Sequence, residues 1–274
     1  MGVSSCNAAS ESQADSLATR KSQLVSEPIL KVHQVPSLGR SSRIEMGGRA
    51  RHLLSDLETR CFTELQWNVA VVEIEEQYAL PLLRTQQIAE ELGIRHPMQP
   101  GTKNPAIMST DFLFSHTIAG RTTLHARAVK PSSAFDLRKP QVARALRRNV
   151  EKLEIERRYW AAQGVDWRLV TDQDLDRIRA ANIRLFLSSS ALDPHEGQQF
   201  WEEALDLVAA RLRAGSDRPL SYLARVAEDE GELLQKHFIA CVRHMCATRV
   251  LTFDLKTEFS PTLRACDFTF AEAR

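Results

Sequence analysis

The sequence lacks long hydrophobic runs, and it lacks an excess of charge of either sign. No apolar stretch approaches the roughly 20 residues that a membrane-spanning helix requires, and the N-terminal residues are polar, without the apolar core of a secretion signal. The chain carries 36 Lys and Arg residues against 35 Asp and Glu residues, a formal net charge of +1. We therefore expect a cytoplasmic protein with no membrane partner, in which any binding of nucleic acid depends on local basic surfaces.

Paired cysteines and repeats are also missing. The five cysteines are an odd number and include no Cys-x-x-Cys pair, which argues against a disulfide framework or a zinc ribbon and favours reduced thiols. No repeat of about 20 to 50 residues is visible, so a solenoid is not expected.

The composition is that of a globular protein, with 43% hydrophobic and 26% charged positions over 274 residues. Residues 1–27 are polar, small and without periodicity. We expect them to form a disordered tail, because they cannot bury enough apolar surface to offset the entropy of ordering. We predict two domains after this tail, over residues 28–176 and 177–274.

Charge is unevenly distributed along the chain. Residues 28–51 hold five basic residues against one acid (+4), and residues 130–160 hold nine against four (+5). Residues 193–235 hold four against ten (−6). The two basic stretches are candidates for contacting phosphates, whereas the acidic stretch is expected to face another protein or solvent.

Residues 55–171 have the pattern of an α/β core. Ser55-Asp56-Leu57-Glu58 is a capping box that begins a helix ending near Trp67. The patterns that follow predict a strand over 71–80, a helix over 85–92, a hairpin with strands at 111–115 and 122–130, a helix from Pro140 to Gly164, and a strand over 167–170. This order predicts a mixed sheet between helices, in three layers.

The pattern becomes mainly helical beyond Thr171. Helices are predicted over about 172–183, 195–214, 220–229 and 232–247, followed by extended runs over 250–255 and 263–270. Helices followed by a terminal hairpin are typical of a winged-helix domain, although many small helical domains would also fit.

The predicted hairpin brings an acid and a lysine together. With the turn centred on Gly120-Arg121, Asp111 lies opposite Lys130 at the end of the sheet. From spacing alone a surface ion pair is the favoured explanation, because cross-strand pairs of Asp and Lys are common.

Glu58 also has two interpretations. As the third residue of a capping box, its carboxylate can accept from the Ser55 backbone N–H. The same position aims it at the sheet edge, where with Asp111 it could hold a hard divalent cation. Two carboxylates and a lysine are the minimum of a metal-dependent phosphodiesterase site.

Two further groups of candidate residues lie on predicted helices. Glu156 lies in a charged run, where solvated pairing at a spacing of four residues is the default explanation. His237, Cys241 and His244 share one helix face, as zinc ligands would, but an adjacent apolar stripe favours a packing role.

Six short motifs follow one another between residues 52 and 160. They are His52-Leu-Leu-Ser-Asp-Leu-Glu58, Glu76-Gln-Tyr78, Gly93-Ile-Arg-His-Pro97, Met108-Ser-Thr-Asp-Phe-Leu113, Val129-Lys-Pro131 and Glu151-Lys-Leu-Glu-Ile-Glu-Arg-Arg-Tyr-Trp160. In this order they closely resemble the TnsA family, the endonuclease subunits of heteromeric transposases. The resemblance covers residues 30–172, and the rest of the chain carries no matching motif.

The resemblance implies a restriction-endonuclease-like catalytic core of the PD-(D/E)xK class and a smaller, mainly helical C-terminal domain of winged-helix type. It implies that Glu58 and Asp111 hold Mg²⁺, for which Mn²⁺ substitutes, that Lys130 completes the active site, and that Glu156 is a further site residue. Two positions depart from the pattern, and one of them, Ala128, bears on the metal ligands; the other is Glu75, where the family usually has Arg. Ala128 stands where the class has an acid and TnsA-like proteins usually have Gln, so a third metal ligand there has to be the Ala128 backbone carbonyl.

The resemblance further implies a magnesium-dependent endonuclease that cuts the 5′ strand at each transposon end, in the bacterial cytoplasm and at the nucleoid during transposition. The implied partners are transposon-end DNA, the DDE-type transposase subunit TnsB and the AAA+ regulator TnsC. Phosphate contacts are expected from four residues of one basic helix, namely Arg144, Arg147, Arg148 and Lys152; a solvated helix face is the alternative. The alternative functions are a non-catalytic adaptor of the transposition complex and a stand-alone repair or restriction nuclease.

Overall fold

The computed structural model describes residues 42–46, 49–136 and 140–272. The chain divides into two compact units, Met1–Leu175 and Asp176–Arg274, a division one residue before the predicted domain boundary. The predicted tail over residues 1–27 lies outside the described residues. No helix in the described ranges is both long and apolar enough to cross a membrane.

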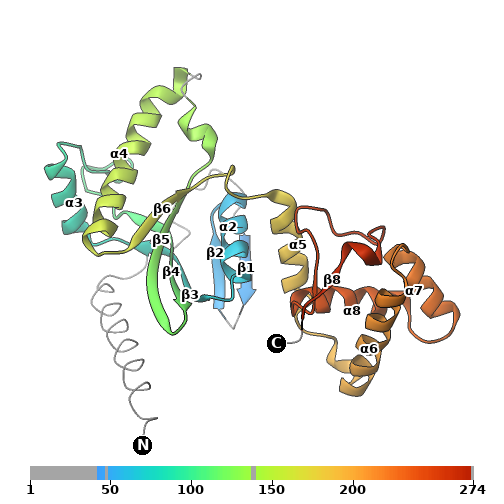
Figure 1. Cartoon of the computed structure of the whole chain (residues 1–274). Coiled ribbons are helices and arrows are strands. Elements are labelled where there is room, and N and C mark those ends of the chain that lie inside the picture. Colours follow the sequence, from blue (N-terminus) through green and yellow to red (C-terminus); the bar gives the residue numbers. More distant parts are fainter. Residues whose placement is uncertain (1–41, 47–48, 137–139, 273–274) are drawn as a thin grey trace, which may run out of the picture. The chain divides into compact units, whose positions relative to one another are not determined.

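The first unit holds a four-stranded sheet and the helices that cover it (Figure 1). Its elements are β1 (Ser42–Met46), β2 (Arg49–Leu53), α2 (Asp56–Trp67), β3 (Val71–Ala79), α3 (Leu82–Glu91), β4 (Ser109–Ile118), β5 (Arg121–Val129), the 3-10 turn η2 (Ser132–Phe135), α4 (Pro140–Ala162) and β6 (Asp166–Val170). The strands are ordered β3-β4-β5-β6, and only the β5/β6 pair is parallel. Strands β1 and β2 form a separate antiparallel pair.

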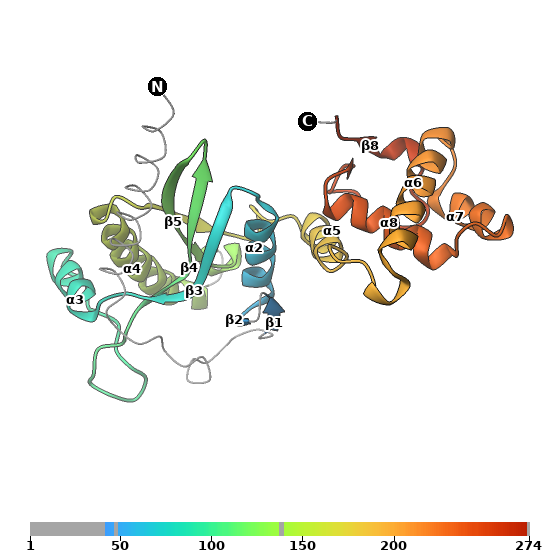
Figure 2. The same ribbon diagram turned by 90° about the horizontal axis from the view of Figure 1, so that it is seen from below.

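Alternation along β4 divides the core into two layers. Phe112 and Phe114 pack with Phe62 of α2, whereas Leu113 packs with Trp160 of α4 on the opposite face. Figures 1 and 2 show α2 on one face of the sheet and α3 and α4 on the other. The mixed α/β architecture predicted from the sequence is confirmed.

The predicted register of the hairpin is wrong. The turn residues are Ala119 and Gly120, both with positive φ (49° and 75°), as a two-residue type I′ turn requires. Ile118 therefore pairs with Arg121 and Phe112 with Arg127, which places Ala128, not Lys130, opposite Asp111. Since side chains alternate with a period of two, this shift of two residues leaves Asp111 and Lys130 on the same face of the sheet.

The second unit is mainly helical. Its elements are α5 (Arg177–Leu187), the 3-10 turn η3 (Pro194–Glu196), α6 (Gln198–Ala214), α7 (Leu220–Asp229), α8 (Gln235–Ala247), β7 (Leu251–Thr252), the 3-10 turn η4 (Ala265–Asp267) and β8 (Thr269–Phe270). Helix α5 begins five residues later than predicted, because Asp174 accepts from the Thr171 backbone and closes a turn there. The two predicted extended runs contain strands of only two residues each, so the winged-helix assignment stays a prediction.

Candidate active site

The N-terminus of α2 positions Glu58. The Ser55 hydroxyl accepts from the Glu58 backbone N–H at 3.1 Å, as the capping box predicts. The carboxylate of Glu58, however, accepts from the Leu54 backbone N–H (3.0 Å) and the Ser55 hydroxyl (3.1 Å), not from the Ser55 N–H. Burial, and then the charge of Asp111, raise the pKa of Glu58. Glu58 therefore caps its helix and also faces a second carboxylate.

Asp111 lies on β4 and accepts hydrogen bonds from both the backbone and a lysine. Its Oδ2 atom accepts from the Val129 backbone N–H at 2.6 Å and from Lys130 Nζ at 2.9 Å. The Asp111 side chain is 10% exposed and that of Lys130 is 40% exposed. The predicted contact between Asp111 and Lys130 thus forms, because the long lysine side chain spans the two residues by which the register differs.

The charge state of Lys130 follows from its neighbours. Burial alone would lower the pKa of Lys130, but the adjacent Asp111, and then Glu156 and Glu58, raise it above the ordinary value. An ammonium held in this state is a hydrogen-bond donor and a positive charge, and it is not a base. Lys130 is thus equipped to stabilise negative charge.

Gln77 connects the two carboxylates, although sequence reasoning did not single it out. Its Nε2 atom donates to Asp111 Oδ1 (3.2 Å) and lies 3.4 Å from Glu58 Oε2. Its Oε1 atom accepts from the Ser109 hydroxyl at 3.0 Å. The only signal available was its place in the motif Glu76-Gln-Tyr78, because nothing in a strand pattern marks a glutamine that turns towards a site.

Glu156 is buried, so solvated pairing is the wrong explanation for it. Only 6% of the residue is exposed, and its Oε1 atom accepts from the Thr110 hydroxyl (2.8 Å) and Trp167 Nε1 (3.0 Å). Burial first, and then the charge of Asp111, raise the pKa of Glu156 to about 7. The ion pairs of the run belong to its neighbours, such as Glu154 with Arg157.

The four predicted site residues are therefore brought to one part of the first unit. Asp111 contacts Lys130, Gln77 bridges Asp111 and Glu58, and Glu156 acts on Asp111 and Lys130 through its charge. Within the described ranges, no group of three His, Cys, Asp or Glu side chains could hold a metal ion. A cation at this place would accordingly need ligands beyond the two carboxylates. Ala128, whose backbone carbonyl is the expected third ligand, is a buried residue with 1% of its surface exposed.

The basic face of α4 is partly neutralised. Arg147 and Arg148 both pair with Glu151, at 3.0 and 2.6 Å. Lys152 makes no ion pair with another described residue, and burial, followed by the charges of Arg148 and Lys130, lowers its pKa. The side chain of Arg144 lies outside the described part of the structure. Lys152 is thus the least compensated cation of the described set.

The histidine and cysteine residues of α8 have packing and hydrogen-bonding roles. Cys241 is fully buried in the core of the second unit. His237 pairs with Glu196 at 3.2 Å, and His244 Nδ1 lies 3.1 Å from the Ser189 carbonyl oxygen. The burial of Cys241 and the contacts of the two histidines agree with the packing interpretation.

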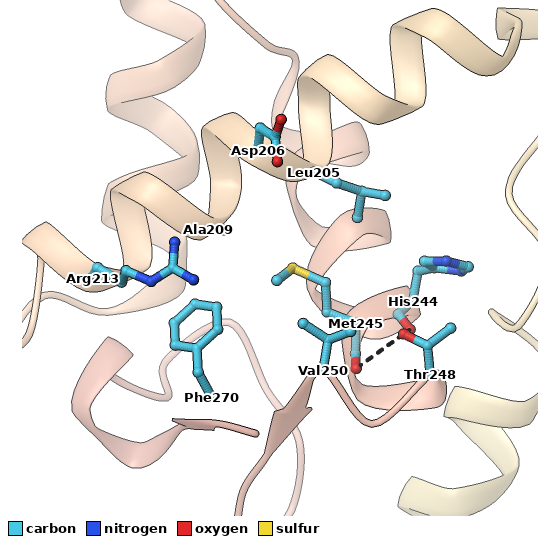
Figure 3. Close-up of a pocket in the computed structure, with 9 residues that line it drawn as sticks. All are labelled: Leu205, Asp206, Ala209, Arg213, His244, Met245, Thr248, Val250 and Phe270. Atoms are coloured by element: carbon cyan, nitrogen blue, oxygen red, sulfur yellow. Dashed lines mark hydrogen bonds between the residues drawn. The ribbon is translucent and has the colours of Figure 1, made fainter. Parts of the chain in front are cut away.

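The second unit has a hollow of its own, drawn in Figure 3. It has a volume of about 440 Å³ and is lined by α6, α8 and the segment around Phe270. The Arg213 guanidinium lies 4.2 Å from the centre of the Phe270 ring, while Asp206 and His244 add polar groups. No pair of carboxylates lines this hollow, so its chemistry differs from that of the predicted nuclease site.

Comparison with known proteins finds similarity within the first unit. A family model described as "TnsA-like endonuclease N terminal" matches residues 68–172, a range that contains Gln77, Asp111, Lys130 and Glu156 but begins after Glu58. The chain is also 40% identical over 163 residues to the "Transposon Tn7 transposition protein TnsA" of Escherichia coli.

That similarity involves only part of each protein. It covers 59% of this chain and 55% of the relative, so the chain spans about half the length of the curated relative it matches. Within its first unit, this chain is thus similar to the TnsA-like endonucleases.

Proposed function

We propose that this chain is the metal-dependent endonuclease subunit of a Tn7-type heteromeric transposase, cutting the 5′ strand at each transposon end. The observation that carries this proposal is the contact of Lys130 Nζ with Asp111 Oδ2, with Glu58 joined to Asp111 through Gln77. Two acids and a lysine gathered at one end of the sheet are the groups that metal-assisted phosphodiester hydrolysis needs. The match to TnsA supports the same reaction.

The residues present fit a hard divalent cation. Glu58 and Asp111 are acceptor-only groups when ionised, and Mg²⁺ and Mn²⁺ prefer such oxygen ligands. We propose these two carboxylates and the Ala128 backbone carbonyl as ligands. When bound, the cation would neutralise phosphate charge and make a bound water more acidic.

Lys130 and Glu156 have different proposed roles. Lys130 is partly exposed and cationic, so it would donate to the attacking water or to the developing negative charge. Glu156 is buried, with its Oε1 atom already accepting from Thr110 and Trp167. Above its pKa of about 7, where Glu156 is ionised, it would act on the reaction through its charge on Lys130 and Asp111.

The remaining assignments rest on the family. We propose that the first unit is a PD-(D/E)xK core, that the second is of winged-helix type, and that α4 contacts DNA phosphates through Arg144, Arg147, Arg148 and Lys152. The proposed partners are transposon-end DNA, the DDE-type subunit TnsB and the AAA+ regulator TnsC, in the bacterial cytoplasm. Support comes from the similarity to a Tn7 transposition protein.

Strand-specific end mapping tests the proposal. Transposon-end DNA is incubated with the chain, its cognate transposase and regulator, and Mg²⁺, and the wild type is compared with Asp111→Ala and Lys130→Ala. Lys103→Ala is the matched control, since Lys103 lies on an exposed loop. We expect 5′ cuts with the wild type and the control, and none with the two site variants, while 3′ cutting persists.

Two other outcomes would contradict the proposal. If 3′ ends are cut but 5′ cuts are absent with the wild type, or do not respond to either site variant, the chain is an adaptor. The side chain of Ala128, which carries no ligand atom, favours this second candidate. Cutting of naked DNA by the chain alone would identify a stand-alone nuclease.

A further inference from the structure

Gln77 has an unusual backbone for a strand residue. Its φ is +50°, and the other non-glycine residues with positive φ in the described ranges are Ala119, in the hairpin turn, and Arg249, which follows α8. A left-handed conformation costs a residue with a side chain roughly 1 to 2 kcal/mol. Such a conformation persists only where the surroundings over-determine it, which is common at functional sites.

Hydrogen bonds of the Gln77 side chain to its surroundings hold the residue in this conformation. Its amide nitrogen donates to Asp111 Oδ1 (3.2 Å) and lies within reach of Glu58 Oε2 (3.4 Å), while its amide oxygen accepts from the Ser109 hydroxyl (3.0 Å). Ionised carboxylates only accept hydrogen bonds, so the nitrogen has to face them and the oxygen has to face Ser109. The orientation of the amide is thereby determined at both ends.

The hydrogen-bond partners of Asp111 show what the Gln77 amide contributes. The Oδ2 atom of Asp111 accepts from the Val129 N–H and the Lys130 ammonium. Among the described residues, Oδ1 accepts from Gln77 alone. Glu58 is held through the Leu54 N–H and Ser55, both belonging to the start of its own helix. Gln77 is therefore the direct link between the acid on α2 and the acid on β4.

We propose that Gln77 is the positioning residue of the divalent-cation site, whose amide holds the Asp111 and Glu58 carboxylates facing one another, with Ser109 anchoring the amide. This inference rests on the metal site of the proposed function. Partners that hydrogen-bond to metal ligands without binding the metal commonly contribute about 10- to 100-fold to its affinity. Gln77 would act in this way, before any DNA is bound.

Mn²⁺ binding by the full chain in the absence of DNA tests this role. Electron paramagnetic resonance measures free Mn²⁺ during a titration of wild type, Gln77→Gly, Ser109→Ala, and the control Gln87→Ala. Glycine suits the positive φ, so Gln77→Gly removes the amide without adding backbone strain. Gln87 is a glutamine of α3 whose partner is Arg84.

We expect Gln77→Gly to weaken Mn²⁺ binding by about 10- to 100-fold, Ser109→Ala to weaken it less, and Gln87→Ala to leave it unchanged. The thermal midpoint of the metal-free protein should stay near that of the wild type in all three, which separates positioning from a purely structural role. Unchanged or tighter binding by folded Gln77→Gly would overturn the inference. If Gln77→Gly fails to fold, unchanged binding by Ser109→Ala overturns it.

Failure of the proposed metal site would give different results from failure of the proposed role of Gln77. If the wild type does not bind Mn²⁺, or if Asp111→Asn binds it as well as the wild type, the proposed ligands are wrong and this role of Gln77 falls with them. If the wild type binds Mn²⁺ and Asp111→Asn does not, the metal site stands, and the Gln77 variants alone decide the inference.

Discussion

Glu156 is a buried carboxyl group, and the groups that donate hydrogen bonds to it are neutral. Trp160 Nε1 donates to the Thr110 hydroxyl at 2.6 Å, and that hydroxyl donates in turn to Glu156. The second donor to Glu156 is Trp167 Nε1. With a pKa of about 7 instead of the ordinary 4.5, the folded protein keeps this proton at pH values where the unfolded chain has released it.

The stability of the protein should therefore depend on Glu156 and on pH. Because the folded state binds the extra proton, the free energy of unfolding falls as pH rises from about 4.5 to about 7 and then levels off, by about 3 kcal/mol in total. Glu156→Gln keeps the acceptor for Thr110 and Trp167, and should remove this dependence and be more stable than wild type at pH 8. Urea unfolding at a series of pH values measures both.

Glu154→Gln is the matched control on the same helix. Glu154 pairs with Arg157 near the surface, and hydrogen bonds from Arg157 and Arg158, opposed by slight burial, lower its pKa to about 2. Its loss should not remove the decline in stability between pH 4.5 and 7. A pH dependence that is the same in Glu156→Gln as in the wild type would show that Glu156 titrates normally.

At the scale of elements, the β4–β5 hairpin is determined by its turn. Ala119 has a φ of +49°, a conformation that asparagine tolerates better than alanine, and Asn-Gly is the favoured pair for a type I′ turn. Ala119→Asn should raise the free energy of unfolding by about 1 kcal/mol. Gly120→Ala should lower it by a similar amount, because a Cβ there meets no atom within 4 Å and only the backbone is strained. Urea unfolding of both variants checks the two signs, and equal signs would contradict this turn.

The helix α4 offers a second prediction at this scale. Lys152 lacks a described acidic partner, whereas Arg157 is paired with Glu154 by two bonds of 2.7 Å. Lys152→Ala should weaken binding to duplex DNA and reduce the slope of log affinity against log salt by about one, as the loss of one phosphate contact does. Arg157→Ala should change this slope less. Fluorescence anisotropy at several salt concentrations measures it, and equal effects would favour a solvated face.

At the scale of the whole molecule, the two units should respond separately to a core mutation. Asn182 of α5 is 3% exposed. Its side chain donates to the carbonyls of Leu255 (2.8 Å) and Thr257 (2.7 Å) and accepts from the Phe259 N–H (3.0 Å). Asn182→Ala should destabilise the second unit by about 3 kcal/mol, since three backbone groups, among them the buried Phe259 N–H, lose their partner.

Hydrogen exchange followed by mass spectrometry measures this effect by segment. We expect protection to fall over residues 176–272 and to persist in the sheet of the first unit, because each unit has its own core. Asn68→Ala, which loses one exposed hydrogen bond to the Ala70 N–H, serves as the control. An equal loss of protection in both units would mean that they unfold together.

Local patterns in the sequence determined most elements of this protein. The capping box predicted α2 from Ser55, and the apolar periodicities predicted α4 and α7 within one or two residues. Each of these signals is contained in one short stretch of chain, where hydrogen bonds and side-chain spacing are local. The motifs around Glu58, Asp111 and Lys130 likewise predicted which charged groups would meet.

Only the tertiary structure decided the features that depend on distant parts of the chain. The backbone at Ala119 set the register, so that Lys130 reaches Asp111 along the strand and not from directly opposite. The burial of Glu156 required Thr110 and Trp167 from two other strands. Gln77 turned towards the two carboxylates because Ser109 and the sheet hold it there. A linear pattern does not record such contacts, since they arise when separate elements pack together.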